Sequence, residues 1–380
     1  MTEDITIAPP RTWEELRTEV QRRTDAQVYP MTGARGEDVR IILGRIDSLD
    51  DDAWGRSWSA MAREWFERGQ ALEATDRKAA ADAFIMAWRY GSFGAWPSAT
   101  SPEKRKSLQV GLDAFARYGR LQAQPIERIE VRFEGGVIPI LLQLPSIDGP
   151  APVMLSLGGL DSFKEYVAER YGPVYMKHKI GWVGLDAPNT GETKLLPRPG
   201  VEKAYSAVID YLLTRKDVDA SRIGLQGVSM GGYWATRFAF AEPKRLKLAV
   251  NWAGPLDAAW APRQIRGALS SKEYLFGLPA ALLAQSGWSS LAELVERQQE
   301  LSIVTMGLVD KPTPQRMLIV NGLKDSLVPA SDTMLLLQHG TPKSAWINPE
   351  GIHLARSAEW NDERIKQQII MPWIVDAMAA

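Results

Sequence analysis

A serine set between glycines is the residue whose surroundings most clearly indicate chemistry. It lies in Gly227–Gly232, which reads GVSMGG, directly after the apolar run Ile223–Gln226 and directly before a helical stretch, Tyr233–Ala241. A nucleophilic serine of this kind sits on a sharp strand-to-helix turn, where the flanking glycines let strand and helix approach closely. The bare GxSxG pattern is common by chance, but this context predicts that Ser229 is a nucleophile.

A serine hydroxyl needs a neighbouring base to become a good nucleophile. The chain has three histidines, His178, His339 and His353. His353 follows the expected last strand, Ser344–Ile347. His339 ends an expected helix, where a cation suits the helix C-terminus, and His178 is expected to pack or lie at the surface of another helix. We therefore predict that His353 is the base.

The partner of the histidine is expected just past the strand Met317–Val320. Asp325 lies in the loop that follows, and an aspartate at a strand end can orient an imidazole. The competing interpretation makes Asp325 a turn residue, and nearby Asp332 is expected to start a helix. The order serine, acid, histidine is that of α/β-hydrolases, so we predict a triad of Ser229, Asp325 and His353.

An oxyanion formed during acyl transfer needs two backbone N–H donors. One is expected from Met230, the residue after the serine. The other is expected from the loop after Val153–Leu157, which begins Gly158-Gly159-Leu160. Paired glycines permit close backbone approach, so Gly159 or Leu160 is the predicted donor; the alternative is a simple tight turn.

Short apolar runs alternate with helical stretches from about residue 126 onward. This pattern predicts an α/β fold, namely an α/β-hydrolase fold with a mostly parallel sheet and helices on both faces. A hairpin at Gly135-Gly136 opens it. The strand candidates are Ile126–Phe133, Val137–Leu144, Val153–Leu157, Gly181–Leu185, Ile223–Gln226, Leu248–Trp252, Met317–Val320 and Ser344–Ile347.

The chain is expected to have two parts. Residues 1–125 show apolar residues at helical spacing and form an expected cap region, with Thr75 predicted to cap a helix that runs to Tyr90. Residues 126–380 form the expected hydrolase domain. Within it the alternation stops over about 255–314, which we interpret as a helical lid inserted at the carboxyl ends of the strands.

Composition excludes several classes of partner. With 45 basic and 46 acidic residues, nothing favours nucleic acid or an anionic membrane. The chain has no cysteine, its three histidines are scattered, and it has no phosphate-binding loop motif, so we expect no metal and no cofactor. No apolar run approaches the roughly 18 residues of a membrane span. The N-terminus does not read as a signal peptide, so a cytoplasmic protein is expected.

Three motifs together resemble a specific family. They are Gly158–Glu165 (GGLDSFKE), Leu185–Glu192 (LDAPNTGE) and Gly227–Gly232. In this order, behind a helical N-terminal region, they resemble the FrsA-like esterases, the 2,6-dihydroxypseudooxynicotine hydrolase group and fungal hydrolases that shorten polyketide pigment precursors. The resemblance implies that the N-terminal helices cap the active site, that the protein is a homodimer, and that carbon–carbon bonds next to a carbonyl are cleaved in some members.

One turn departs from the family pattern. The family reads Pro-Gly-x-Gly-Glu where this chain has Pro188–Glu192 (PNTGE). Asparagine tolerates left-handed backbone angles, so we expect Asn189 to keep the turn. The resemblance makes Glu192 a candidate accessory residue, with a structural role as the alternative. It also implies an assisting carboxylate in some carbon–carbon hydrolases, for which Asp257 is the candidate here.

The substrate is expected to be a small apolar or aromatic carbonyl compound. The chain has 14 tryptophans. Aromatic residues at helical spacing usually belong to a core, but as a group they favour an apolar pocket. The predicted substrate-binding residues are Trp88, Tyr90, Trp252, Trp260 and Tyr274.

The expected reaction is hydrolysis through an acyl-enzyme, or of a carbon–carbon bond if the leaving group is a stabilised carbanion. In the second case His353 can instead activate water directly. We favour carbon–carbon or polyketide-type substrates over simple esters because of the cap. A dehydratase, a cyclase or a small-molecule receptor on the same fold is the alternative, because fold does not fix function.

Overall fold

The computed structural model describes residues 7, 9, 11–313 and 315–380. The N-terminal residues on which the signal-peptide prediction chiefly rests lie outside the described residues, as does Pro314, the last residue of the expected insertion. The chain forms two compact units. The sheet unit contains Glu127–Glu273 and Gln285–Ala380, and the helical unit contains Ile7–Ile126 and Tyr274–Ala284.

The sheet unit is built on one eight-stranded sheet with the order β1-β2-β4-β3-β5-β6-β7-β8. Strand β2 is antiparallel to β1 and β4, and all other neighbours are parallel. The predicted α/β-hydrolase fold is therefore confirmed. The strands are β1 (Glu127–Phe133), β2 (Gly136–Gln143), β3 (Ala151–Leu157), β4 (Gly181–Leu185), β5 (Val218–Val228), β6 (Leu248–Trp252), β7 (Arg316–Gly322) and β8 (Ser344–Asn348).

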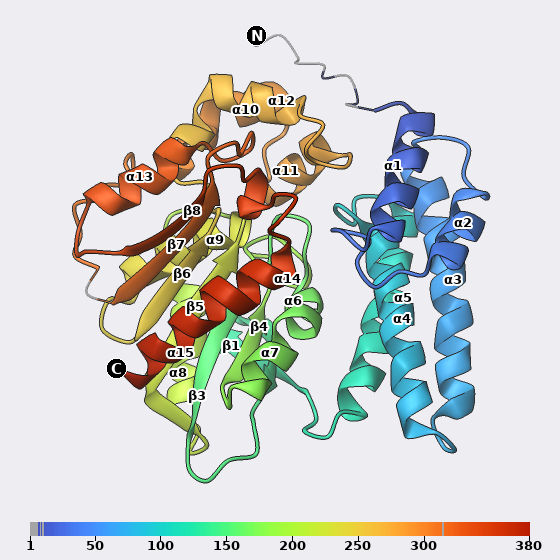
Figure 1. The fold of residues 1–380 in the computed structure, drawn as a ribbon, viewed down its shortest axis with the longest axis horizontal. Coiled ribbons are helices and arrows are strands. Elements are labelled where there is room, and N and C mark those ends of the chain that lie inside the picture. The colour runs from blue at the N-terminus through green and yellow to red at the C-terminus, as the bar shows by residue number, and fades with distance from the viewer. Residues whose placement is uncertain (1–6, 8, 10, 314) are drawn as a thin grey trace. The chain divides into compact units, whose positions relative to one another are not determined.

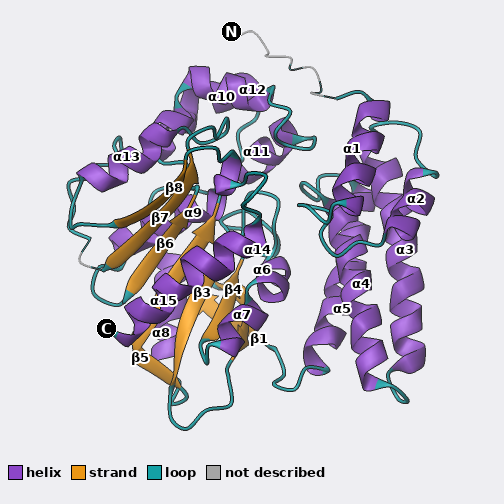
Figure 2. Ribbon diagram, in the orientation of Figure 1, coloured by secondary structure: helices purple, strands orange, loops and turns teal. Residues whose placement is uncertain are grey.

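Helices cover both faces of this sheet because its central strands are apolar on both sides; β3, β4 and β6 are buried at every position. In Figure 2, α14 and α15 cross in front of the strands, and α9 lies behind them. The helices wholly in this unit are α6 (Lys164–Arg170), α7 (Gly172–Lys177), α8 (Glu202–Leu213), α9 (Met230–Ala241), α10 (Pro262–Leu269), α12 (Leu291–Arg297), α13 (Ala330–Gln338), α14 (Asp362–Ile365) and α15 (Met371–Ala379).

Parallel pairing brings four loops to one edge of the sheet. Val228 at the end of β5 pairs with Trp252 at the end of β6, and Trp252 pairs with Val320 in β7. Gly322 at the end of β7 pairs with Asn348 at the end of β8. The loops that follow these strands therefore start side by side, which is where open α/β sheets bind ligands.

The helical unit contains α1 (Trp13–Asp25), α2 (Gly36–Leu43), α3 (Asp51–Leu72), α4 (Arg77–Ala95) and α5 (Pro102–Arg120), as Figure 1 shows. The prediction that Thr75 caps the fourth helix is wrong. Asp76 is the cap, because its carboxylate accepts a hydrogen bond from Ala79 N at 2.9 Å. This helix also continues past Tyr90, through Gly91 and Gly94, to Ala95, and it ends before Pro97.

A distant segment completes the core of the helical unit. Tyr274 stacks on Trp96 with ring centroids 5.1 Å apart, and Leu275 is buried with Trp58. Arg11 donates hydrogen bonds of 2.8 Å to the carbonyl oxygens of both Tyr274 and Leu275. The helix α11 (Leu278–Ser286) then leads the chain back to the sheet unit.

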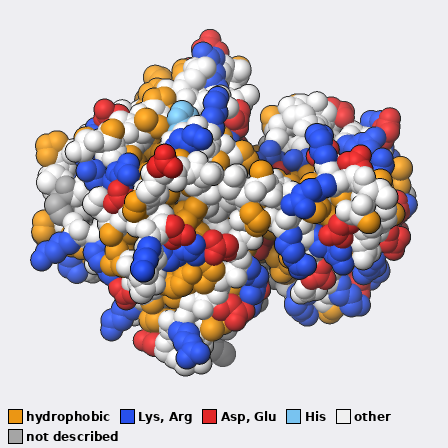
Figure 3. Space-filling view, turned by 90° about the horizontal axis from the view of Figure 1, so that it is seen from below, with side chains coloured by type: hydrophobic (Ala, Val, Ile, Leu, Met, Phe, Trp, Pro, Cys, Tyr) orange, Lys and Arg blue, Asp and Glu red, His pale blue; other side chains and the backbone are white. Residues whose placement is uncertain are grey.

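The surface carries both signs of charge. On the face drawn in Figure 3, Lys and Arg side chains are interspersed with Asp and Glu side chains. In the part of the chain that the structure describes, every helix is too short or too polar to cross a membrane.

Candidate active site

Ser229 occupies a strained turn between β5 and α9. Its φ is 54° and its ψ is −123°, a conformation that costs a non-glycine residue about 1–3 kcal/mol. A Cβ on Gly227 would lie 1.8 Å from the carbonyl oxygen of Gly231, so only glycine fits there. The Ser229 backbone is anchored on both sides, because its N–H donates to Trp252 O at 2.8 Å and its carbonyl accepts from Gly232 N at 2.7 Å. The turn is therefore fixed, and its geometry is that of a nucleophile elbow.

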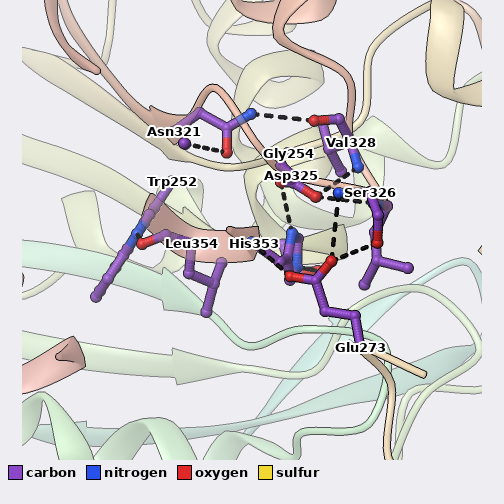
Figure 4. A network of polar contacts seen from close by, with 12 residues as sticks. Trp252, Gly254, Glu273, Asn321, Asp325, Ser326, Val328, His353 and Leu354 are labelled. Carbon is purple, nitrogen blue, oxygen red and sulfur yellow. Dashed lines mark hydrogen bonds and ion pairs between the residues drawn. The ribbon is translucent and has the colours of Figure 1, made fainter. Parts of the chain in front are cut away.

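The structure brings Ser229, His353 and Asp325 together in one chain of hydrogen bonds. Nε2 of His353 lies 2.8 Å from Ser229 Oγ, and Nδ1 lies 2.8 Å from Asp325 Oδ2. An ionised carboxylate can only accept, so Nδ1 carries the proton and Nε2 is left to accept from the serine hydroxyl. The other oxygen of Asp325 accepts from Leu327 N and Val328 N at 2.8 Å each, which fixes the carboxylate (Figure 4).

The loop that carries His353 is held by contacts on its far side. Leu354 has a φ of 63°, and its carbonyl accepts a 2.8 Å hydrogen bond from Trp252 Nε1. Asn348 Nδ2 donates to Ala355 O, also at 2.8 Å. These contacts hold a left-handed backbone that a free loop would leave, so the imidazole is oriented before any substrate binds.

Burial and charge act in opposite directions on His353. Burial lowers the pKa of its imidazole, but the charge of Asp325 and its hydrogen bond raise it, as does the charge of Glu273, and the net shift is upward. Arg356 opposes the rise. The folded pKa therefore lies above the ordinary value of about 6.5.

The raised pKa of His353 predicts where the rate falls on the acid side of the pH–rate profile, its acid limb. A base must be neutral, so the rate of modification of Ser229 should fall as pH decreases through a value above that of free imidazole. The check is the rate of fluorophosphonate labelling of Ser229 measured from pH 5 to pH 9. A limb below the pKa of free imidazole would contradict the shift.

The elbow lies against the loop that follows β3. A Cβ built on Gly159 would be 3.4 Å from Ser229 Cβ, and one built on Gly231 would be 2.3 Å from the carbonyl oxygen of Gly158. Met230 begins α9, and the first N–H groups of a helix have no intrahelical acceptor. Gly159 therefore lies close to Ser229, and the N–H of Met230 is among the first of the helix that starts directly after the serine.

The two candidate accessory carboxylates are engaged elsewhere. Asp257 accepts hydrogen bonds from Gln299 Nε2 at 3.1 Å and from the Ser302 hydroxyl, which tie the start of the insertion to its later part. Glu192 forms ion pairs with Lys164 and with Arg128, the latter at 2.9 Å. The structure does not bring either carboxylate into a hydrogen bond with the serine or the histidine among the described residues.

The predicted substrate-binding aromatics lie in both units. In the sheet unit, Trp252 is buried beside the histidine loop, and Trp260 contacts Tyr233 edge to face. In the helical unit, Trp88 packs on Phe115 within the core, and Tyr90 donates to Asp38 at 2.7 Å. Tyr274 lies on Trp96 in the same unit.

The other polar residues considered in the sequence lie at a turn and at helix ends. Asn189 has a φ of 55°, so the expected left-handed turn is confirmed, and its Nδ2 donates to Gln285 O at 3.1 Å. His339 is the C-cap of α13, and exposed His178 is the C-cap of α7. Asp332 does lie in the first turn of α13, but it is buried.

Sequence reasoning missed what the Asp332 carboxylate does. It accepts backbone hydrogen bonds from the loop after β6, at Leu256, Asp257, Ala258 and Ala259. It also missed Glu273, which contacts the histidine loop. Neither residue belongs to a motif, and both act on segments far away in sequence.

Comparison with known proteins identifies the family to which the chain belongs. A family model described as "Esterase FrsA-like" matches residues 45–350, which is most of the chain. The chain belongs to the FrsA-like esterase family.

Individual relatives of known name share about a quarter to a third of their residues with this chain over the matched part. The chain is 32% identical over 255 residues to hydrolase ORFZ of Pyricularia oryzae, covering 60% of this chain and 58% of the relative. It is 26% identical over 228 residues to 2,6-dihydropseudooxynicotine hydrolase of Paenarthrobacter nicotinovorans, covering 58% and 60%. The matches thus span less than two thirds of these relatives. The crystal structure of 2,6-dihydroxy-pseudo-oxynicotine hydrolase shares the fold, with a TM-score of 0.76 at 20% identity over 96% of this chain and 95% of that one.

Proposed function

We propose that the protein hydrolyses a small apolar or aromatic carbonyl compound through a Ser229-His353-Asp325 triad. The observation that carries the proposal is the unbroken hydrogen-bond chain from Asp325 through His353 to Ser229, with both links at 2.8 Å, on a strained elbow. A protein that only bound a ligand would not need a serine in this conformation and a histidine of this orientation.

The proposed chemistry uses each group in turn. His353 Nε2 takes the hydroxyl proton while Ser229 Oγ forms a bond to the carbonyl carbon. The N–H of Met230, with that of Gly159 or Leu160, stabilises the oxyanion. The bond to the leaving group then breaks, and His353 gives its proton to that group. Water, activated by the same histidine, releases the acid and restores the serine.

The leaving group decides between an ester and a ketone substrate. An alkoxide leaves from an ester, and a resonance-stabilised carbanion leaves from a β-diketone or an acyl-phenol. One relative is named an esterase and another a 2,6-dihydropseudooxynicotine hydrolase. We favour cleavage of the carbon–carbon bond, with Trp252 and Trp260 of the sheet unit as the candidate aromatic contacts to the substrate. We also propose that the protein is a homodimer and that it acts in the cytoplasm. Gel filtration with light scattering measures the oligomeric state.

Two substrate panels test the proposal. One contains p-nitrophenyl esters of short and medium acyl chains, and the other contains β-diketones and acyl-phenols followed by mass spectrometry. We expect cleavage in the second panel and fluorophosphonate labelling at Ser229. Ester cleavage alone would leave the triad in place and make the protein a carboxylesterase. No reaction in either panel and no label would favour a dehydratase, a cyclase or a receptor.

A further inference from the structure

Glu273 connects the two loops that carry the acid and the base. Its Oε1 accepts a 2.6 Å hydrogen bond from His353 N, the backbone of the candidate base. Its Oε2 accepts from Ser326 N at 3.2 Å and from the Ser326 hydroxyl, and Ser326 directly follows Asp325 (Figure 4). One carboxylate therefore holds the backbone at both ends of the Asp325–His353 hydrogen bond.

The segment that carries Glu273 makes further contacts with the acid loop. Ser271 Oγ lies 3.0 Å from Ser326 Oγ, and Gln264 Nε2 donates to Ser326 O at 3.0 Å. Ser271 also accepts from Glu273 N at 3.1 Å, so the glutamate is itself fixed. Glu273 is the last residue of the sheet unit before the chain enters the helical unit at Tyr274. The acid loop is thus held by the insertion and not only by its own turn.

We propose that Glu273 is a positioning residue for the triad, which keeps Asp325 and His353 in register through the backbone of their loops. This inference rests on the proposed function, because it concerns the same site. Glu273 acts through the backbone of His353 and through Ser326, and it is not itself a member of the triad.

Glu273 also contributes negative charge beside the imidazole. The charged groups that act on His353 are Asp325, Glu273 and Arg356, and Arg356 is itself paired with Asp362 at 2.5 Å. Lys324 and Glu350 pair with each other nearby along the chain. Of the two carboxylates that raise the pKa of His353, Asp325 bonds the ring directly and Glu273 does not. Loss of the Glu273 charge should therefore lower this pKa, and activity should persist to lower pH.

The test compares Glu273→Gln and Glu273→Ala with a matched control, Glu293→Gln. Glu293 lies in the same insertion and also accepts from a serine, through Ser289 N at 2.9 Å and Ser289 Oγ at 2.6 Å, but it contacts neither triad loop. The readout is the second-order rate of fluorophosphonate labelling of Ser229 against pH, with thermal melting as the check on folding.

We expect Glu273→Gln to label about 10-fold more slowly at its optimum, with its acid limb a few tenths of a pH unit lower, and Glu273→Ala to be slower still. Glutamine keeps one acceptor for His353 N, but its amide nitrogen only donates and so cannot accept from Ser326 N. Glu293→Gln should label like the wild type. A fall in rate with an unmoved acid limb would assign Glu273 a purely structural role and overturn the electrostatic part.

The failures of the two proposals are distinguishable. Suppose that the wild type is labelled at Ser229 and that Glu273→Gln has the same labelling rate and the same acid limb. The positioning inference is then wrong while the proposed function stands. If wild type does not label at all, the proposed function itself has failed. Should Glu273→Gln not fold, Glu273→Asp keeps the charge with a shorter reach. That variant should label about 3-fold more slowly with an unmoved limb, and labelling at the wild-type rate would overturn the inference.

Discussion

Replacing Ser229 with alanine is expected to lower kcat by about 10⁵-fold while leaving the protein folded. Alanine lacks the Oγ atom that attacks the carbonyl carbon. The variant should still fold, because alanine is no more strained than serine at a φ of 54°. The elbow keeps its backbone hydrogen bonds to Trp252 O and from Gly232 N. The measurement is steady-state hydrolysis of the best substrate from the two panels, with mass spectrometry to confirm that fluorophosphonate no longer labels the protein.

Ser344→Ala is the matched control for this change. Ser344 lies at the exposed start of β8, at the end of the strand opposite to the one that leads to the candidate site. The control should retain wild-type kcat. Substantial turnover in Ser229→Ala with a diketone substrate would exclude an acyl-enzyme and assign His353 to the direct activation of water.

The sheet and the triad could be predicted because their signals are local. Gly181–Leu185 and Leu248–Trp252 are apolar runs bounded by turns, and the observed strands have the same bounds as the expected ones. Parallel pairing then places the ends of neighbouring strands at one edge. Given a serine after β5, an aspartate after β7 and a histidine after β8, their proximity in the structure follows from the topology rather than from any single residue.

The contacts that hold this arrangement could not be predicted in the same way. Glu273 binds residues about 50 and 80 positions away, and the four donors of Asp332 lie on the opposite side of the insertion. Such contacts depend on the path of an irregular segment, the insertion after β6. The sequence of such a segment has no helical or strand periodicity from which its path could be predicted. The same reason explains why no sequence pattern separated Tyr274–Ala284, which packs in the helical unit, from the rest of the insertion.

The second large effect is on stability and arises from a buried group of charges beside the oxyanion loop. Lys164 is fully buried and forms ion pairs with Glu165 at 3.0 Å, with Asp186 at 3.2 Å and with Glu192. Its backbone N–H also donates to Asp186 Oδ1 at 2.8 Å. Burial raises the pKa of Glu165, and the charge and hydrogen bond of Lys164 lower it, so the charged form of this carboxylate is favoured by the ammonium group.

Lys164→Met is expected to lower the free energy of unfolding by about 3–5 kcal/mol at neutral pH. Methionine fills a similar volume but leaves the buried carboxylates without their shared cation. The charge of Lys164 lowers the pKa values of Glu165 and Glu192, so these pKa values should rise in the folded variant. The variant is then least destabilised where the two carboxyl groups are protonated, and its deficit against wild type should shrink as pH falls. Urea unfolding at several pH values measures both effects.

Lys78→Met supplies the control for this prediction. Lys78 is exposed and pairs with Asp82 at 3.0 Å on the surface of α4, where solvent screens the interaction, so its loss should scarcely move the midpoint of unfolding. If Lys164→Met unfolded at the same urea concentration as Lys78→Met, the buried charges would be supported by their other hydrogen bonds. A deficit that grew as pH fell would contradict the assignment of Lys164 as the cation that keeps these carboxylates ionised. Loss of the Lys164 charge is also expected to disturb the candidate active site. Lys164 lies five residues after Gly159, and the loop that begins at Gly158 packs against the elbow.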